Sequence, residues 1–259
     1  MRQTDSEIHP VWSGCFPSWS EARSALSSKD ESESLFAVSD WLQRQQDLLN
    51  STISALNRLS YEEPRRPSLL PLLVTDSSSA ARSIVDFGGG CGWVFAACQH
   101  AGARIEHYTI IELSTVVSEF SPVTKDPLRY RDVSTFLKSP QLRADILYSN
   151  SCLQYQSDNS LFISIVNKCR PTQILVDELL WSRGEDWFSI QTNSEVDTIS
   201  RFVSVSNLVT ELAMVGYSLV WRNSSSGNEY RSFPSMSEFD QSYRIQSRLS
   251  LLFALSKGS

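Results

Sequence analysis

The segment with the clearest chemical character is a glycine-rich stretch, Asp86-Phe87-Gly88-Gly89-Gly90-Cys91-Gly92, which follows the apolar pair Ile84-Val85. Glycine permits positive φ angles and lets a ligand come close to the main chain. A helical pattern begins at Trp93, so the unpaired N–H groups of a helix N-terminus would face the same ligand. The stretch therefore predicts a strand, a tight loop and a helix that bind a ligand through the backbone.

A second acidic residue stands at an informative distance from this loop. Glu112 lies 20 residues beyond Gly92 and ends the next apolar run, Tyr108 to Ile111. In doubly wound sheets, a carboxylate at this place accepts hydrogen bonds from ribose hydroxyls. The two features together favour a nucleoside-containing ligand, with a tight turn and a solvated strand-end carboxylate as the alternative interpretation.

The residue types around the loop distinguish a pyrophosphate from a cationic cofactor. A dinucleotide fingerprint would place its last glycine or alanine at position 93, where this chain has Trp93. Asp86 would repel a pyrophosphate, but its charge suits the amino acid and sulfonium groups of S-adenosylmethionine (SAM). The loop thus favours SAM, and an oxidoreductase with a nicotinamide cofactor is the less favoured alternative.

The elements that must position the loop alternate between strand-like and helix-like patterns. They lie near residues 84–87, 93–100, 108–111, 128–130, 145–149, 161–168, 173–177 and 205–215, and a final hairpin joins 217–222 to 248–255. Such alternation implies βαβ units on a mostly parallel sheet. We therefore expect an α/β fold with a doubly wound, seven-stranded, Rossmann-like sheet.

The chain before residue 81 lacks this alternation. Apolar residues from Val38 to Leu59 recur mostly at three- and four-residue intervals, which predicts one long amphipathic helix. Pro64 and Pro67 then interrupt any helical pattern. We expect an N-terminal helical extension over residues 1–80 and a SAM-binding domain over residues 81–259.

The glycine stretch resembles the first motif of class I SAM-dependent methyltransferases, which is a hydrophobic strand, an acid and then GxGxG. Asp86, Gly88, Gly90 and Gly92 match that motif position by position. A narrower resemblance covers most of the chain, to a family of bacterial methyltransferases often associated with surface-polysaccharide gene clusters. Three segments carry it, namely WSGCFPSWSEA at 12–22, DFGGG at 86–90 and ADILYSNSCLQY at 144–155.

The resemblance implies a SAM-dependent methyltransferase that acts on a small molecule or a glycan. Cofactor contacts would come from the loop and the strand ends, at Asp86, Phe87, Gly88, Gly89, Gly90, Gly92, Glu112, Leu113, Asp132 and Asn150. The transfer site would follow the fourth strand, at Asn150, Gln154 and Tyr155, although Tyr155 is equally suited to packing. Asp177-Glu178 departs from the narrower family, in which we expect a basic residue there. A non-catalytic SAM-binding or scaffold protein is the alternative.

Several aromatic residues allow two interpretations. Trp12, Phe16 and Trp19 could form a lid over the cofactor, and Trp181 and Trp187 could line the acceptor pocket, but packed core is the alternative for each. The segment 223–247 could shape a pocket or form a surface loop.

Composition excludes other classes of protein. The net charge is −6 with scattered Lys and Arg, which argues against nucleic-acid binding. Five cysteines without a CxxC pair and three histidines without ligand spacing predict neither a disulfide framework nor a metal site. No apolar run approaches the ~20 residues of a membrane span and no signal peptide is evident, so we expect a cytoplasmic protein. The sequence indicates no particular oligomeric state.

Overall fold

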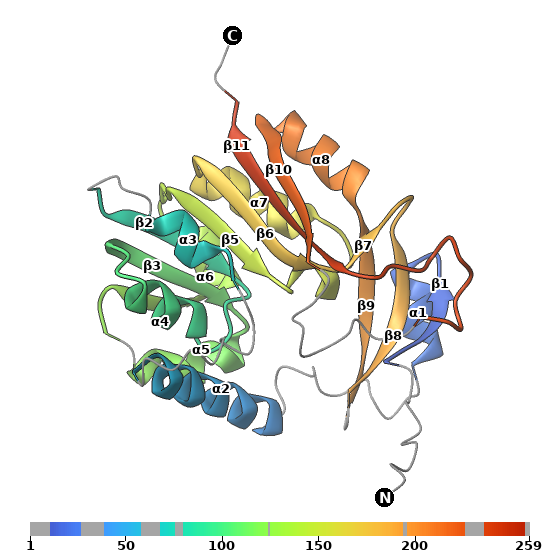
Figure 1. Cartoon of the computed structure of the whole chain (residues 1–259), viewed down its shortest axis with the longest axis horizontal. Coiled ribbons are helices and arrows are strands. Elements are labelled where there is room, and N and C mark those ends of the chain that lie inside the picture. The colour runs from blue at the N-terminus through green and yellow to red at the C-terminus, as the bar shows by residue number, and fades with distance from the viewer. Residues whose placement is uncertain are drawn as a thin grey trace, which may run out of the picture.

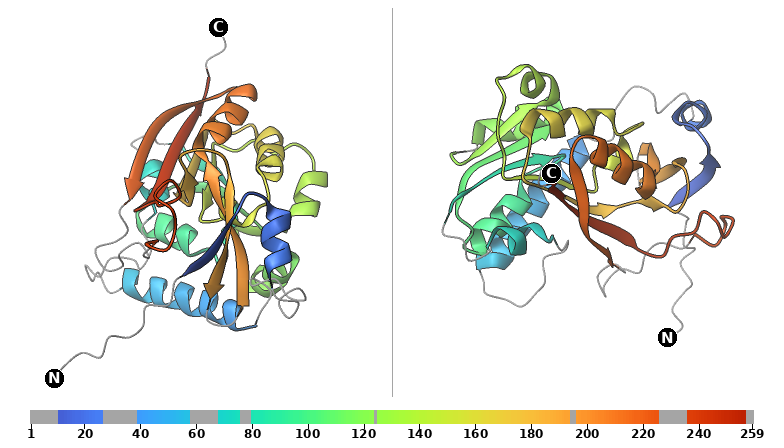
Figure 2. Two further views of the ribbon diagram at one scale, coloured as in Figure 1. Left: turned by 90° about the vertical axis from the view of Figure 1, so that its right-hand side faces the viewer. Right: turned by 90° about the horizontal axis from the view of Figure 1, so that it is seen from above.

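The computed structural model describes residues 11–26, 39–57, 68–75, 80–123, 125–193, 196–225 and 236–256. These residues form two sheets, one of seven strands and one of four (Figure 1). The larger sheet carries helices on both faces (Figure 2), as a doubly wound fold requires.

The larger sheet has the order β10-β11-β6-β5-β2-β3-β4. Its strands are β2 (Arg82–Phe87), β3 (Ile105–Glu112), β4 (Leu128–Asp132), β5 (Ile146–Asn150), β6 (Gln173–Leu179), β10 (Tyr217–Ser225) and β11 (Arg248–Leu255). Strands β2 to β6 pair in parallel, and β11 runs antiparallel to both of its neighbours. The predicted α/β class, the seven strands and the final antiparallel hairpin are confirmed.

Two apolar layers cover the faces of this sheet. The helices are α3 (Leu70–Val74), α4 (Trp93–His100), α5 (Ser114–Phe120), α6 (Val133–Lys138), α7 (Ser160–Cys169) and α8 (Val205–Met214). Buried residues of α3, α4 and α5 form one layer, and those of α6, α7 and α8 form the other. Two short 3₁₀ turns, η2 (Ser121–Val123) and η3 (Leu153–Tyr155), complete the connections.

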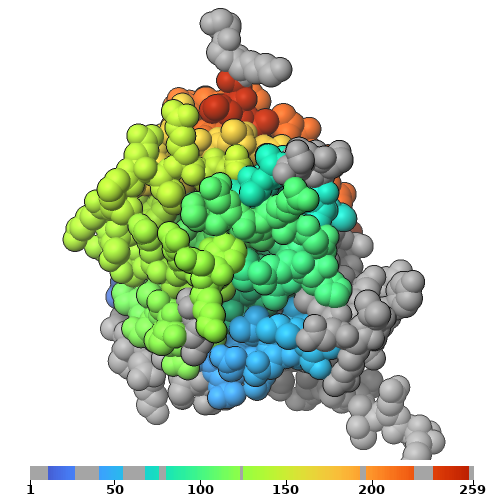
Figure 3. All heavy atoms as spheres, turned by 90° about the vertical axis from the view of Figure 1, so that its left-hand side faces the viewer, coloured from blue at the N-terminus to red at the C-terminus, as the bar shows by residue number. Residues whose placement is uncertain are grey.

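The long helix expected before the core is α2 (Ser39–Asn57), which agrees with the predicted 38–59 to within two residues. Its apolar stripe, including Trp41 and Leu48, packs on the layer that contains α4. In the space-filling view, α2 forms a blue band directly below the green segments of the same face (Figure 3). The helix therefore lies on the main domain.

The four-stranded sheet was not expected. It has the order β1-β8-β9-β7, with β1 (Trp12–Phe16), β7 (Trp181–Ser182), β8 (Trp187–Asn193) and β9 (Val196–Ser204). The hairpin β8–β9 lies beyond the carboxyl ends of β5 and β6, with β1 along its outer side (Figures 1 and 2). Helix α1 (Trp19–Ala25) packs on one face of it. The first 80 residues thus contain a strand as well as helices, and the division at residue 80 stays a prediction.

Most of the aromatic residues with two interpretations pack in the core of this smaller sheet, whereas Trp181 is only partly buried and lines a cavity. Trp12 is 2% exposed, with its ring centroid 5.6 Å from that of Phe202, and Trp187 stacks on the same Phe202. Trp19 meets Phe188 edge to face at 5.9 Å. These contacts favour the packed-core interpretation over the lid. Within the 223–247 segment, residues 223–225 extend β10, 226–235 lie outside the described residues, and Met236, Phe239 and Ile245 join this core.

Across the part of the chain that the structure describes, no helix combines the length and the apolar character of a membrane-spanning segment.

Candidate functional site

The glycine loop connects β2 to α4 at the carboxyl edge of the larger sheet. The Gly88 N–H donates to the Ile111 carbonyl at 2.9 Å, which ties the loop to β3. A Cβ at Gly88, where φ is +77°, would collide with Cys152, and one at Gly89 would lie 2.5 Å from Asp86 Oδ2. The two glycines are therefore required by close approach within the protein itself.

Asp86 lies under the loop and is fully buried. Its Oδ2 accepts a hydrogen bond from the Tyr108 hydroxyl at 2.7 Å, while Oδ1 has no partner among the described residues. Burial raises the pKa of Asp86 to about 7, in opposition to the Tyr108 hydrogen bond and with help from nearby Glu112. A buried carboxylate oxygen without a partner is costly, so a donor or a positive charge supplied by a ligand would be stabilised here.

Glu112 ends β3 and reaches across to the loop. Its Oε1 accepts from the Gly90 N–H at 3.0 Å, and its Oε2 accepts from the Leu113 N–H at 2.9 Å. Burial raises the pKa of Glu112, and these two hydrogen bonds oppose that shift. A carboxylate has about four acceptor positions, so it can hold the loop and still accept from a diol.

Helix α2 contributes a residue that the sequence did not indicate. A Cβ at Gly90, where φ is +56°, would lie 3.1 Å from Gln45 Oε1. The side chain of Gln45 therefore stands directly over the loop backbone. No sequence signal marks it, because its place depends on how α2 docks beside α4.

The end of β5 forms the other flank of the loop. The Ser149 hydroxyl donates to the Phe87 carbonyl at 3.1 Å, and Asn150 Nδ2 donates to the Tyr148 hydroxyl at 2.8 Å. Because β2 pairs with both β3 and β5, Glu112 and Asn150 lie on opposite sides of the same loop. The structure thus brings together Asp86, the glycines, Glu112 and Asn150.

The other two predicted transfer residues lie in η3, the turn that follows β5. Gln154 is 1% exposed, and its Oε1 has no partner among the described residues. The Tyr155 hydroxyl donates to Gln191 Oε1 of β8 over a long 3.4 Å, and Ser200 of β9 donates to the same oxygen at 2.6 Å. Turn η3 therefore meets the smaller sheet.

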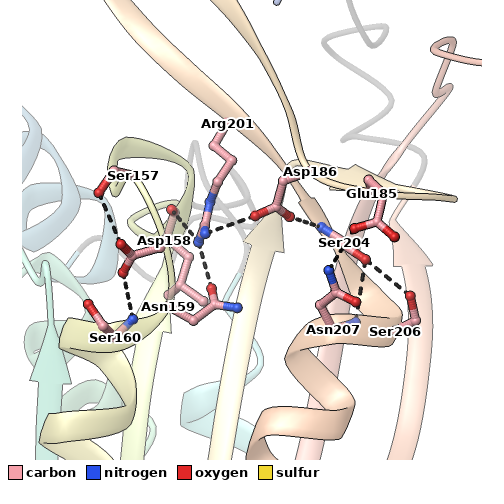
Figure 4. A network of polar contacts seen from close by, with 11 residues as sticks. Ser157, Asp158, Asn159, Ser160, Glu185, Asp186, Arg201, Ser204, Ser206 and Asn207 are labelled. Atoms are coloured by element: carbon pink, nitrogen blue, oxygen red, sulfur yellow. Dashed lines mark hydrogen bonds and ion pairs between the residues drawn. The ribbon is translucent and has the colours of Figure 1, made fainter. Parts of the chain in front are cut away.

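A buried arginine fixes this junction (Figure 4). Arg201 of β9 is fully buried, and its guanidinium donates to the Leu153 carbonyl at 3.3 Å, to Asn159 Oδ1 at 2.6 Å and to Asp186 Oδ2 at 3.2 Å. The Ser204 N–H donates to the remaining oxygen of Asp186. Burial lowers the pKa of Arg201, and Asp186 opposes this. The contacts join η3, the start of α7 and the smaller sheet.

Of three further predicted cofactor residues, two have other side-chain contacts in the structure and one is exposed. The side chain of Phe87 packs in the core against Phe162 at 6.1 Å, so only its main chain borders the loop. Asp132 is the N-cap of α6 and accepts from the Thr135 hydroxyl and N–H, which lower its pKa. Leu113 is 41% exposed beside Glu112 and is free to contact a ligand. Their roles toward a cofactor stay predictions.

Asp177 stands where the narrower family is expected to have a basic residue. It is buried and has a structural role. It accepts from the Leu69 N–H at 3.1 Å and from the Ser250 hydroxyl, which joins β6 to α3 and β11.

No group of three or more His, Cys, Asp or Glu suited to a metal ion occurs among the described residues. The polar groups at the carboxyl edge of the larger sheet are carboxylates, amides and backbone N–H groups.

No protein-family model and no curated protein matches the chain. Several solved structures are similar to it. The methyltransferase bound to the Trm112 methyltransferase activator of Haloferax volcanii is similar with a TM-score of 0.54 and 14% identity, over 87% of this chain and 99% of that one. The Burkholderia thailandensis 1,6-didemethyltoxoflavin-N1-methyltransferase, solved with its substrate and S-adenosylhomocysteine, is similar with a TM-score of 0.52 and 15% identity, over 83% of this chain and 88% of that one. At these identities the likeness establishes the methyltransferase-type Rossmann-like fold.

Proposed function

We propose that this chain binds SAM over the glycine loop and transfers its methyl group to a small-molecule or glycan acceptor. The observation that carries the proposal is the buried Asp86, whose Oδ1 has no hydrogen-bond partner in the described ranges. Glu112 binds the backbone of the same loop from the β3 side. The burial of two carboxylates at one loop disfavours a pyrophosphate and suits a ligand with cationic groups.

Each part of the edge has a role in this proposal. Asp86 interacts with the amino or sulfonium charge, directly or through water, and Glu112 accepts from the ribose hydroxyls. Leu113 covers the adenine ring with its exposed side chain, and Asp132 meets the adenine amino group if it releases one of its hydrogen bonds to Thr135. Gln45 of α2 closes the loop from above.

The transfer step requires alignment more than acid–base chemistry. SAM supplies an activated methyl group, and an acceptor oxygen or nitrogen displaces it in line. Asn150 lies on the flank of the loop where it can orient the acceptor, and Tyr155 with Gln191 offers polar groups beyond it. A base is needed only if the acceptor must lose its proton early.

The acceptor class rests on two kinds of support. The solved Burkholderia thailandensis neighbour acts on 1,6-didemethyltoxoflavin, a small molecule, and the resemblance to methyltransferases associated with surface-polysaccharide gene clusters adds glycans. The polar groups around η3 suit a hydrophilic acceptor. We therefore propose hydroxylated small molecules and glycans as the first acceptors to test.

Calorimetric titration with SAM, S-adenosylhomocysteine and NADH in parallel tests the cofactor. Micromolar binding of both adenosyl sulfur compounds and none of NADH is the expected result. Binding of NADH alone would overturn the proposal in favour of an oxidoreductase. Tight SAM binding, followed by no methyl transfer to any member of an acceptor panel, would favour the non-catalytic binding protein.

A further inference from the structure

A cavity of about 440 Å³ lies beyond the carboxyl end of β6, and none of the loop residues 86–92 lines it. Its walls come from β7, the end of β10 and the residues before β11. The residues that matter here are Trp181, Arg183, Arg222, Asn223, Ser224 and Gln246. The volume falls within the roughly 300–1,000 Å³ of small-molecule sites in proteins.

The lining of this cavity is positively charged in a protein whose net charge is −6. Arg183 and Arg222 both face it, and its lining contains no acidic residue in the part of the chain that the structure describes. Within the described ranges, neither arginine has an acidic partner. An arrangement of two uncompensated guanidinium groups around one hollow attracts an anion.

The acidic residues closest to this cavity in the sequence are engaged elsewhere. Asp186 pairs with Arg201 at 3.2 Å, and Glu185 accepts from Asn207 at 3.1 Å. Glu178 pairs with Arg248 at 3.6 Å. These three carboxylates are therefore paired with other groups, and among the described residues none of them lines the cavity.

One of the two arginines is held in place. The Arg222 guanidinium carbon lies 5.4 Å from the centroid of the Trp181 ring, a cation–π distance. The ring is itself fixed, because the Trp181 Nε1–H donates to the Ser247 carbonyl at 2.9 Å. A guanidinium that is already positioned loses less side-chain entropy when it binds a ligand.

The remaining lining groups define the rest of the ligand. Asn223, Ser224 and Gln246 add neutral amide and hydroxyl groups, which hydrogen-bond to hydroxyls rather than to hydrocarbon. Guanidinium groups bind carboxylate and phosphate oxygens with two parallel hydrogen bonds. We propose that this cavity binds a small hydrophilic molecule through a carboxylate or phosphate group held by Arg183 and Arg222. The inference rests on the cavity and holds whether or not the chain transfers methyl groups.

The indole N–H resonance of Trp181 reports on the cavity directly. Protein labelled with ¹⁵N-tryptophan is titrated with inorganic phosphate and, separately, with acetate, and sodium chloride keeps the ionic strength constant because screening alone weakens charge interactions. Comparison with Trp181→Phe assigns the resonance. We expect a saturable shift of Trp181, with Trp93 of α4 unaffected. Saturation by phosphate, acetate or both identifies which oxyanion the site accepts.

Two arginine variants and a matched control decide the outcome. Arg183→Gln and Arg222→Gln should each weaken the binding of phosphate or acetate about tenfold. Arg143→Gln removes one exposed charge at the opposite, amino-terminal edge of the sheet and should leave the affinity unchanged. Unchanged resonances of the other tryptophans verify the fold of each variant. A shift that never saturates, or equal affinity in all three variants, would overturn the proposal, and SAM titration of the same samples tests the methyltransferase proposal separately.

Discussion

The glycine loop after β2 and the smaller sheet beyond β6 are organised by different interactions. The loop is held through its own backbone N–H groups, which donate from Gly88 to the Ile111 carbonyl and from Gly90 to the Glu112 carboxylate. The smaller sheet is joined to the main domain by a side chain, because the guanidinium of Arg201 makes the contacts with η3 and Asn159. Substitutions of the loop glycines should therefore act through lost space, and substitutions of Arg201 through lost charge.

The largest effect is expected from Arg201→Met, which leaves Asp186 and Asn159 without their buried partner. We expect a loss of about 3–5 kcal/mol in the free energy of unfolding, measured by urea denaturation. The control is Arg129→Met, which breaks the exposed pair with Asp126 and should lower stability by no more than about 1 kcal/mol. Equal losses in the two variants would contradict the structural role of the Arg201 network.

Gly90→Val tests the loop. Valine at a φ of +56° is strained, and its side chain would meet Gln45, so SAM affinity should fall by at least about 100-fold, or 2.7 kcal/mol. Gly102→Val is the matched control, since Gly102 also has a positive φ, of +81°, but has open space around it. Calorimetry should show unchanged SAM affinity for that control. If both variants bind SAM normally, the loop is not the cofactor site.

Glu112→Ala removes the charge-assisted acceptor from the loop. SAM affinity should weaken by about 1–3 kcal/mol, as measured by calorimetry. Glu119→Ala, in the exposed part of α5, should have no effect on SAM affinity. A loss in the control of the same size would show that the effect comes from net charge and not from the site.

A pH dependence of the free energy of unfolding is expected to arise from Asp86. Because its folded-state pKa is raised to about 7, the folded protein binds this proton more tightly than the unfolded chain does. The free energy of unfolding, relative to Asp86→Asn, should therefore fall as pH rises from about 4 to 7, by up to about 1.4 kcal/mol per unit. It should be constant above that range. Denaturation of both proteins at several pH values measures the difference, and a difference independent of pH would place the pKa near its ordinary value.

The same contrast explains how much the sequence could predict. The loop, the parallel strands and the spacing from Gly92 to Glu112 are local, and the structure has them where the patterns indicated. The smaller sheet was missed because β1 contains Gly14 and Cys15 in place of an apolar alternation, and its partner β8 lies far along the chain. The polar run Asn193-Ser194-Glu195 in the sequence, between two strand-like runs, is a signal that could have revealed the hairpin β8–β9.

Contacts that depend on how distant elements pack together could not be predicted from the sequence either. Gln45 stands over Gly90 only because α2 lies beside α4, and Tyr155 meets Gln191 only because β8 turns back toward η3. Asp132 illustrates the opposite problem, since its position favoured an adenine contact while its local sequence also makes it a helix cap. A pattern along the chain does not decide between two such uses of one carboxylate.

The pairing of β1 with β8 also constrains how the chain can fold. The Ser189 hydroxyl donates to the Ser13 carbonyl, a contact between residues 176 positions apart. At a synthesis rate of about 5–20 residues per second, β1 leaves the ribosome roughly 10–35 s before its partner strand exists. Strands β2 to β5 of the larger sheet are made within that interval, before β8 is available to pair with β1. Until then the edge of β1 and the indole of Trp12 remain exposed to other chains, which makes this strand the point of greatest aggregation risk during biogenesis.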